Sequence, residues 1–170
     1  DLEGYVRPGN VVIDEPGVLF ERRAKIIDRV LTAADDRRLI AELAASDVVV
    51  CGPTTIAVDA AVLDRPTILF NFHSGSGPLL DDTQESYDSD HMRYVLERGA
   101  ARLAHSAEEL RSWVKRYLAE PALDHTGRKR LAEDQGWRLD GKSSERVARE
   151  ILALLPESAK NEPEPQKGIQ

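Results

Sequence analysis

A strand-to-helix junction near the middle of the chain carries the residue types best suited to binding a phosphate. Residues 48–51 form a continuous apolar run of strand length, and Gly52, Pro53, Thr54 and Thr55 lead from it into a helical pattern. The first turn of a helix offers unpaired backbone N–H groups and the positive end of the helix dipole, and the two threonines add hydroxyl donors. The junction therefore suits a diphosphate.

An acidic residue follows this junction at a spacing that could serve a nucleotide. Asp59 lies four residues after Thr55, and therefore on the same face of the predicted helix. A carboxylate one turn behind a phosphate site can accept hydrogen bonds from ribose hydroxyls. On residue types alone a simpler alternative is favoured, in which Thr54 is an ordinary N-cap and Asp59 a solvated side chain.

Four further residues are candidates for contact with a bound donor. His73 lies just after a predicted strand, in a long loop, and His91 begins a predicted helix. Each histidine is as readily explained as an exposed side chain. Ser143 and Ser144 follow a lysine in the segment 140–144, which could place a cation and two hydroxyls near a diphosphate. A turn followed by a serine N-cap is the slightly favoured alternative there.

The sequence predicts no metal site. The four histidines are too scattered, and too far from Cys51, to show metal-ligand spacing. The acidic residues between 81 and 90 could recruit Mg²⁺, but a solvated acidic loop explains them better. His105 is expected to be structural, His125 to lie on a helix surface, and the basic group 128–130 to be a solvated helix face.

Strands and helices alternate along the chain and must position these residues. Short β-branched or apolar runs predict four strands, near residues 10, 48, 67 and 101. Continuous apolar runs of this kind are typical of parallel strands that are covered on both faces. The predicted helices include the residues with helical spacing at 26, 27, 30 and 31, a helix opening at Asp35 or Asp36, and residues 54–63, 91–98, 106–119, 125–135 and 143–155.

This order of elements predicts an α/β fold with a parallel sheet and helices on both faces. In such sheets ligands bind beyond the carboxyl ends of the strands. Residues 52–55, the loop after Phe70 and the segment near His105 are therefore the places to look for a site. The loop from Asn71 to about Asp90 is long for a compact domain and is a further functional candidate.

The composition limits the kinds of protein this chain can be. Its 170 residues suit one domain, expected to span residues 1–155, with a tail at 156–170 whose polar, proline-rich composition predicts disorder. A net charge of −7 argues against non-specific nucleic-acid binding. The single cysteine excludes an internal disulfide and fits a reducing compartment. There is no run of about 18 apolar residues to span a membrane.

Residues 46–68 (SDVVVCGPTTIAVDAAVLDRPTI) resemble the donor-site signature of GT-B glycosyltransferases. In that family a strand leads through a small Ser/Thr/Gly loop into a helix carrying an acid, and then through a Lys/Arg-Pro turn into another strand. Asp59 falls where the family places its ribose-binding acid, which is usually Glu. Residues 91–101 and 106–110 are similar to the segments that follow. Residues 139–147 resemble the C-terminal motif of CDP-glycerol glycerophosphotransferase-like and surface-polysaccharide transferases.

The resemblance covers residues 35–155 and implies a Rossmann-like three-layer domain, the donor-binding C-terminal half of a GT-B transferase. Four strands are predicted where the family has six, so this half is expected to be truncated at its amino end. The implied reaction transfers a glycosyl or glycerophosphate group from a nucleotide sugar or CDP-glycerol to a cell-surface polymer or glycan. An N-terminal acceptor domain or a partner subunit would supply the acceptor site and the general base, so no catalytic residue is assigned.

The resemblance also bears on cofactors and location. The nucleotide-activated donor is a substrate, and neither a cofactor nor a protein-bound metal is expected. The chain is expected in the cytoplasm, at the inner face of the membrane if anywhere on it, with at most peripheral contact. Two alternatives stay open: a related nucleotide-sugar 2-epimerase, which shares the fold, and a non-catalytic remnant that binds nucleotides or only a partner.

Overall fold

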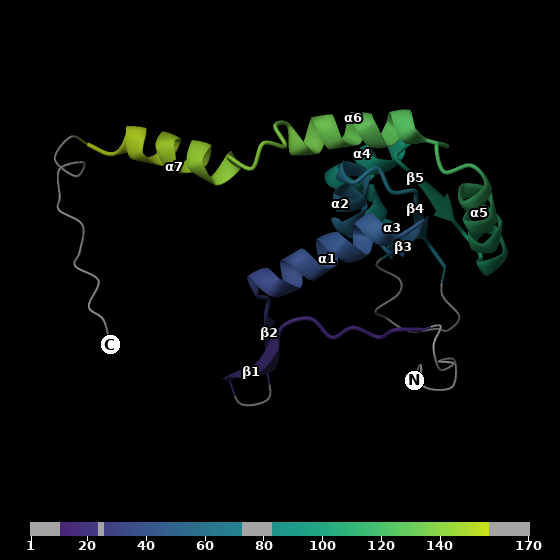
Figure 1. The fold of residues 1–170 in the computed structure, drawn as a ribbon, viewed down its shortest axis with the longest axis horizontal. Coiled ribbons are helices and arrows are strands. Elements are labelled where there is room, and N and C mark those ends of the chain that lie inside the picture. The colour runs from purple at the N-terminus through teal and green to yellow at the C-terminus, as the bar shows by residue number, and fades with distance from the viewer. Residues whose placement is uncertain (1–10, 24–25, 73–82, 157–170) are drawn as a thin grey trace.

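The computed structural model describes residues 11–23, 26–72 and 83–156 (Figure 1). The predicted tail from residue 157 onward lies outside these residues. The described elements, in chain order, are β1 (Val18–Arg23), β2 (Ile26–Val30), α1 (Ala33–Ala45), β3 (Val49–Cys51), α2 (Ile56–Val62), β4 (Thr67–Phe70), α3 (Thr83–Asp88), α4 (Asp90–Glu97), β5 (Ala101–Ala104), α5 (Ala107–Ala119), α6 (His125–Gly136) and α7 (Ser143–Leu154).

A three-stranded parallel sheet forms the centre of the molecule, with the strand order β3-β4-β5. Val49 pairs with Thr67, and Leu69 pairs with Leu103. The strands predicted near residues 48, 67 and 101 are therefore confirmed, and so is the α/β class. The sheet and its helices are compatible with a Rossmann-like fold.

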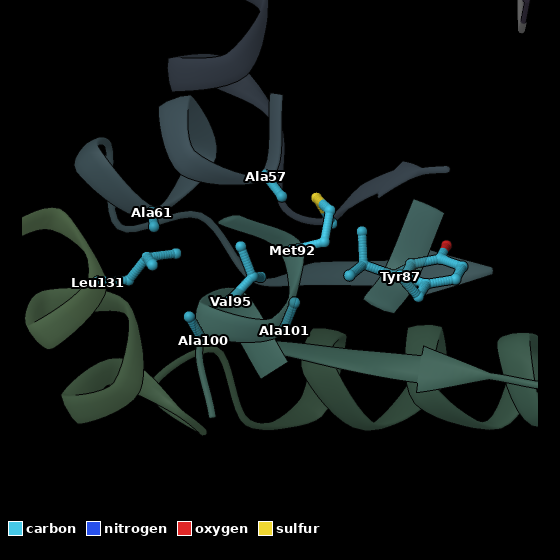
Figure 2. Close-up of a cluster of buried hydrophobic side chains, with 9 residues drawn as sticks. Ala57, Ala61, Tyr87, Met92, Val95, Ala100, Ala101 and Leu131 are labelled. Atoms are coloured by element: carbon cyan, nitrogen blue, oxygen red, sulfur yellow. The ribbon is translucent and has the colours of Figure 1, made fainter. Parts of the chain in front are cut away.

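Helices cover both faces of β4. Consecutive residues of a strand point to opposite faces of the sheet, so neighbouring residues of β4 pack against different helices. Leu69 packs into a cluster built from α2, α3, α4 and α6, which Figure 2 shows around Met92 and Val95. Ile68 points the other way, into a cluster with Tyr117 of α5. Both Ile68 and Leu69 are fully buried. The layers predicted for the domain are thus present around its central strand.

The edge strand β3 departs from this pattern. Val49 is buried, but Val50 remains 44% exposed. Among the described residues no strand pairs with β3 on the side away from β4. The expectation that residues 48–51 are covered on both faces is therefore wrong for Val50.

The segment before α1 differs from the sequence-based expectation. The structure has an antiparallel hairpin, in which Val18 pairs with Val30 and Arg23 with Ile26. Residues 11–13, predicted to be a strand, form none, and the helix predicted around residues 26–31 is wrong. Two apolar pairs separated by two residues fit a helix, yet three of the four are β-branched, which favours a strand once a partner run is available.

Two helix starts rest on side-chain caps. Thr32 caps α1, because its hydroxyl accepts from the Asp35 N–H and its own N–H donates to the Asp35 carboxylate at 2.8 Å. The cap lies three residues before Asp35 and four before Asp36, the two positions predicted for it. Ser106 caps α5 as predicted, with its hydroxyl accepting from the Glu109 N–H at 3.1 Å.

The two last helices differ in how they are held. α6 packs against α2, and it approaches the turn after α4 so closely that a Cβ atom at Gly127 would lie 2.1 Å from the carbonyl oxygen of Gly99. α7 has no buried residue and stands apart from the sheet at the end of α6 (Figure 1). None of the helices in the described part of the chain is long and apolar enough to cross a membrane.

Candidate functional site

The predicted phosphate site lies at the carboxyl edge of the sheet. β3 ends at Cys51, the turn Gly52–Thr55 follows, and α2 begins at Ile56. Because all three strands run in the same direction, β4 and β5 also end at this edge. The turn therefore occupies the position at which parallel α/β sheets bind ligands.

Hydrogen bonds within the turn leave one threonine side chain exposed to solvent. Thr55, and not Thr54, holds the N-cap position of α2, and its side chain makes no capping hydrogen bond. The Thr54 hydroxyl accepts a long bond of 3.4 Å from the Ile56 N–H. The carbonyl of Thr55 accepts from the N–H groups of Val58 and Asp59, at 2.8 and 3.2 Å. The simpler alternative is therefore wrong by one residue for the N-cap position, but the Thr54 hydroxyl still bonds an N–H at the helix start, and Asp59 is solvent-exposed as that alternative expects.

Asp59 is exposed on the same face of α2 as Thr55, as the four-residue spacing predicts. Its carboxylate borders a groove between α1 and α2 that encloses about 380 Å³. The groove is lined by Asp36, Leu39, Ile40, Leu43, Asp59, Val62 and Leu63. Asp59 therefore lies between the threonine turn at one end and a mostly apolar groove at the other.

The predicted site residues elsewhere in the chain divide into two groups. His91 is exposed in the first turn of α4, and Met92 beside it packs near Ala57 of α2 (Figure 2). Because α4 leads back to the start of β5, its first turn lies at the same carboxyl edge as the threonine turn. His73 lies outside the described residues.

Ser143 and Ser144 are exposed at the start of α7, away from this edge (Figure 1). The structure thus brings the turn, Asp59 and His91 to one side of the sheet and does not bring the two serines there. A guanidinium beside the serines is instead used locally, because Arg146 donates to both carboxylate oxygens of Asp140, at 3.0 and 2.9 Å.

One buried residue at this edge, Tyr87, was not predicted as part of it. Tyr87 of α3 is 3% exposed, and its hydroxyl donates to the carbonyl of Phe70, at the end of β4, at 2.7 Å. Burial raises the pKa of Tyr87 to about 12, and burial likewise raises the pKa of Cys51 to about 11. Residues 71–90 were interpreted as one loop, so α3 and the role of Tyr87 in closing the strand end were missed.

A second polar cluster lies at the opposite, amino edge of the sheet. Arg128 is 1% exposed and donates to Asp64 at 2.8 Å and to the carbonyls of Leu123 and Pro121 at 2.6 and 3.2 Å. The ring of His125 contacts the other oxygen of Asp64 at 2.9 Å. The prediction that residues 128–130 form a solvated face is therefore wrong for Arg128, while His125 is half-exposed on α6.

The charges of this cluster fix α6 to the rest of the domain. Burial raises the pKa of Asp64, but hydrogen bonds from Arg128 and His125 outweigh it and hold that pKa below its usual value. Asp124 behaves in the same way: burial raises its pKa, and hydrogen bonds from Arg102 and Tyr117 lower it further than burial raises it. Every partner is another protein group, so the cluster acts as a structural clamp.

The comparisons leave the family open. No family model, no curated protein and no solved structure matches the chain. In the described part of the chain, no group of three or more His, Cys, Asp and Glu side chains is arranged to hold a metal ion. The resemblance to GT-B transferases therefore rests on the sequence motifs, and the structure adds the α/β architecture in which they lie.

Proposed function

We propose that this chain is the donor-nucleotide-binding part of a transferase that moves a glycosyl or glycerophosphate group from a nucleotide-activated donor to a cell-surface polymer or glycan. The supporting observation is the junction after Cys51, where a parallel strand opens through a small turn into α2. Thr55 and Asp59 stand on one exposed face of that helix. The sequence motif at 46–68, which resembles the donor-site signature of GT-B transferases, spans this junction.

Each exposed group at the edge has a role in this proposal. The Thr55 hydroxyl donates to the diphosphate, which lies at the positive end of the α2 dipole, and Asp59 accepts from the ribose hydroxyls. The N–H groups of residues 56–58 are bonded to Thr54 and Thr55 and are not donors to it. His91 contacts the donor from α4. As the bond to the leaving diphosphate breaks, the hydroxyl and the helix dipole offset the charge that develops on it. The acceptor site and the general base belong to another domain or subunit, in the cytoplasm.

A non-catalytic nucleotide-binding remnant is the second candidate. The open edge of β3 and the exposed Val50 favour it, because a three-stranded sheet supplies only part of a Rossmann-like domain. Both candidates require nucleotide binding. They differ in one result: adding a domain or subunit that binds the acceptor restores group transfer for the transferase and does not for the remnant.

Calorimetric titration of the whole chain with CDP, UDP and GDP tests the proposal. We expect one nucleotide to bind, and Asp59→Ala to weaken it about tenfold, equivalent to about 1.4 kcal/mol. Glu150→Ala, which replaces an exposed acid on α7, removes the same charge away from this edge and leaves binding unchanged. Failure of all three nucleotides to bind would overturn the donor-site assignment.

A further inference from the structure

The groove between α1 and α2 presents apolar side chains that nothing in the described part of the chain covers. Leu39 and Ile40 of α1 are 39% and 55% exposed, and Val62 of α2 is 36% exposed. They belong to the lining of the groove of about 380 Å³ that Asp59 borders. Contiguous exposed apolar surface of this kind marks an interaction site, because burying it removes it from water.

The walls of the groove specify the backbone conformation of its occupant. α1 and α2 use their own N–H and C=O groups in internal hydrogen bonds, so the groove offers apolar side chains and no backbone partners. An extended strand would bury unpaired backbone groups there. A third helix brings its hydrogen bonds with it and packs into the furrow between two helices.

The acids of the groove specify the charge of the occupant. Asp36 and Asp59 stand on opposite walls, and no Lys or Arg is among the lining residues. In the described part of the chain neither carboxylate has an ion-pair partner. A lysine or arginine of the occupant can lay its apolar stem along the leucines and reach either carboxylate with its charged head.

The exposed helix α7 of the same chain does not fit this description. Its apolar stripe, formed by Val147, Ile151 and Leu154, is bordered at helical spacing by the acid Glu150 on one side and by Ser144 and Ala148 on the other, with no lysine or arginine directly beside it. Its two arginines are held elsewhere, because Arg146 pairs with Asp140 and Arg149 with Glu145. Docked in the groove of a second copy, α7 would set acid against acid.

From these observations we infer that the α1–α2 groove docks an amphipathic helix of a partner protein that carries lysine or arginine within its apolar face. The 13 residues of α1 set the length of the contact at about 20 Å, or roughly 13 residues of the partner helix. The inference does not depend on nucleotide binding. Asp59 borders both sites, whereas Asp36, Leu39 and Ile40 belong to the groove alone.

The test uses a fluorescent peptide of leucine and lysine, about 14 residues long, with leucines at helical spacing. Fluorescence anisotropy with the whole chain is compared for this peptide, a scrambled peptide of the same composition, and one with glutamate in place of lysine. We expect the amphipathic lysine peptide to bind at least about tenfold more tightly than either control.

Two sets of variants locate the binding. Ile40→Asp and the double variant Asp36→Asn with Asp59→Asn are each expected to weaken binding of the lysine peptide about tenfold. Leu118→Asp on α5 is the matched control for the first, because Leu118 and Ile40 are both 55% exposed. Glu108→Gln with Glu133→Gln removes the same charge elsewhere and is the control for the second. Both controls are expected to bind as the wild type does.

Three results would overturn the inference. Equal binding of the scrambled peptide would show attraction by charge alone. Unchanged binding by Ile40→Asp would place the peptide outside the groove. A dimer in light scattering that Ile40→Asp converts to a monomer would show that a second copy occupies the groove. Nucleotide titration of Ile40→Asp separates this inference from the proposed function, because that variant keeps the threonine turn and Asp59.

Discussion

At the scale of single residues, Arg128 illustrates how a buried charge is accommodated. Its guanidinium reaches one carboxylate and two carbonyls, all close to the junction between α2 and α6. Burying such a group requires that its donors be paired, and Arg128 meets that requirement with the fixed fork of its side chain. The carboxylate belongs to Asp64, in the turn after α2, where the backbone is left-handed with a φ of 54°.

Replacing Arg128 with Met keeps the apolar stem and removes the donors. We expect Arg128→Met to lower the free energy of unfolding by about 2–3 kcal/mol, since two carbonyls lose their partner. The half-exposed carboxylate of Asp64 can turn to water, which keeps the loss below that of a fully buried pair. Urea unfolding followed by circular dichroism measures the change.

Lys129→Met is the control for this prediction, because Lys129 is an exposed neighbour on the same helix. Its effect is expected to stay within about 0.5 kcal/mol. A loss below about 1 kcal/mol for Arg128→Met would mean that the clamp contributes little to stability.

The sequence predicted the positions of some of these residues and missed others. The placement of Thr55 and Asp59 after a strand and a turn could be predicted because the strand, the turn and the helix are consecutive in the chain. Arg128 could not, since its partner Asp64 lies 64 residues away and its neighbours 129 and 130 are exposed as the charge run suggests. Burial of one member of a charge run is decided by tertiary packing.

At the scale of elements, α2, α4 and α6 approach one another through small side chains. Ala57 and Ala61 of α2 line the cluster shown in Figure 2, together with Ala100 before β5. Gly127 allows α6 to touch the turn at Gly99, whose φ of 65° follows the end of α4. Close packing of this kind leaves little room for added atoms.

The contact at Gly127 gives a prediction for the docking of α6. A methyl group there would lie 2.1 Å from a backbone oxygen, so Gly127→Ala must displace the helix. We expect a loss of about 1–3 kcal/mol in the free energy of unfolding, despite the better helix propensity of alanine. Thermal unfolding of the variant and the wild type provides the comparison.

Gly52→Ala provides the contrast, because a methyl group at Gly52 would meet only a ring carbon of Phe70, at 3.7 Å. No loss of stability is expected for that variant. If Gly127→Ala were equally harmless, the close approach of α6 to Gly99 would not exist in solution.

Helices and strands could be predicted wherever the spacing of apolar residues fitted only one kind of secondary structure. The parallel strands were short apolar runs bounded by turns, and α5 had a serine cap and regular spacing. The segment before α1 could not be predicted, because its apolar residues at 26, 27, 30 and 31 fit both a helix and a strand. A partner strand at 18–23 decided between them, and pairing between segments is not encoded in local spacing.

At the scale of the whole molecule, the lowered pKa values of Asp64 and Asp124 link stability to pH. Both carboxylates are charged and bonded in the folded chain. A group whose pKa is depressed by folding stabilises the fold above its unfolded pKa, about 3.9 for aspartate, and this contribution is lost as the pH falls through the folded value. Stability is therefore expected to decline below about pH 4.

Asp124→Asn is expected to be less stable than the wild type by about 1.5–3 kcal/mol at pH 7, because the hydrogen bonds from Arg102 and Tyr117 lose their charged acceptor. It should lose less on acidification, so the two curves of stability against pH converge at low pH. Urea midpoints between pH 7 and pH 2.5 measure both curves. Parallel curves would contradict this assignment.

The arrangement of the central strand and its helices could be predicted from the sequence, but the surroundings of the edge strand could not. Alternating strands and helices gave the parallel order and the two covered faces, since connections in such folds follow few paths. The exposure of Val50 was not predictable, because it depends on what lies beside β3 and not on the apolar run itself. The lack of buried residues in α7 was likewise not predictable, because its sequence has the amphipathic pattern of a helix that packs on a core.

The single thiol of the chain sits at the start of the threonine turn, with a pKa of about 11. At neutral pH almost all of it is protonated, and oxidants and alkylating agents react with the thiolate. The carboxyl edge of the sheet therefore carries a thiol whose burial disfavours the reactive thiolate form. Alkylation of Cys51 is therefore expected to be slow at neutral pH and to become faster when local opening of this edge exposes the thiol further.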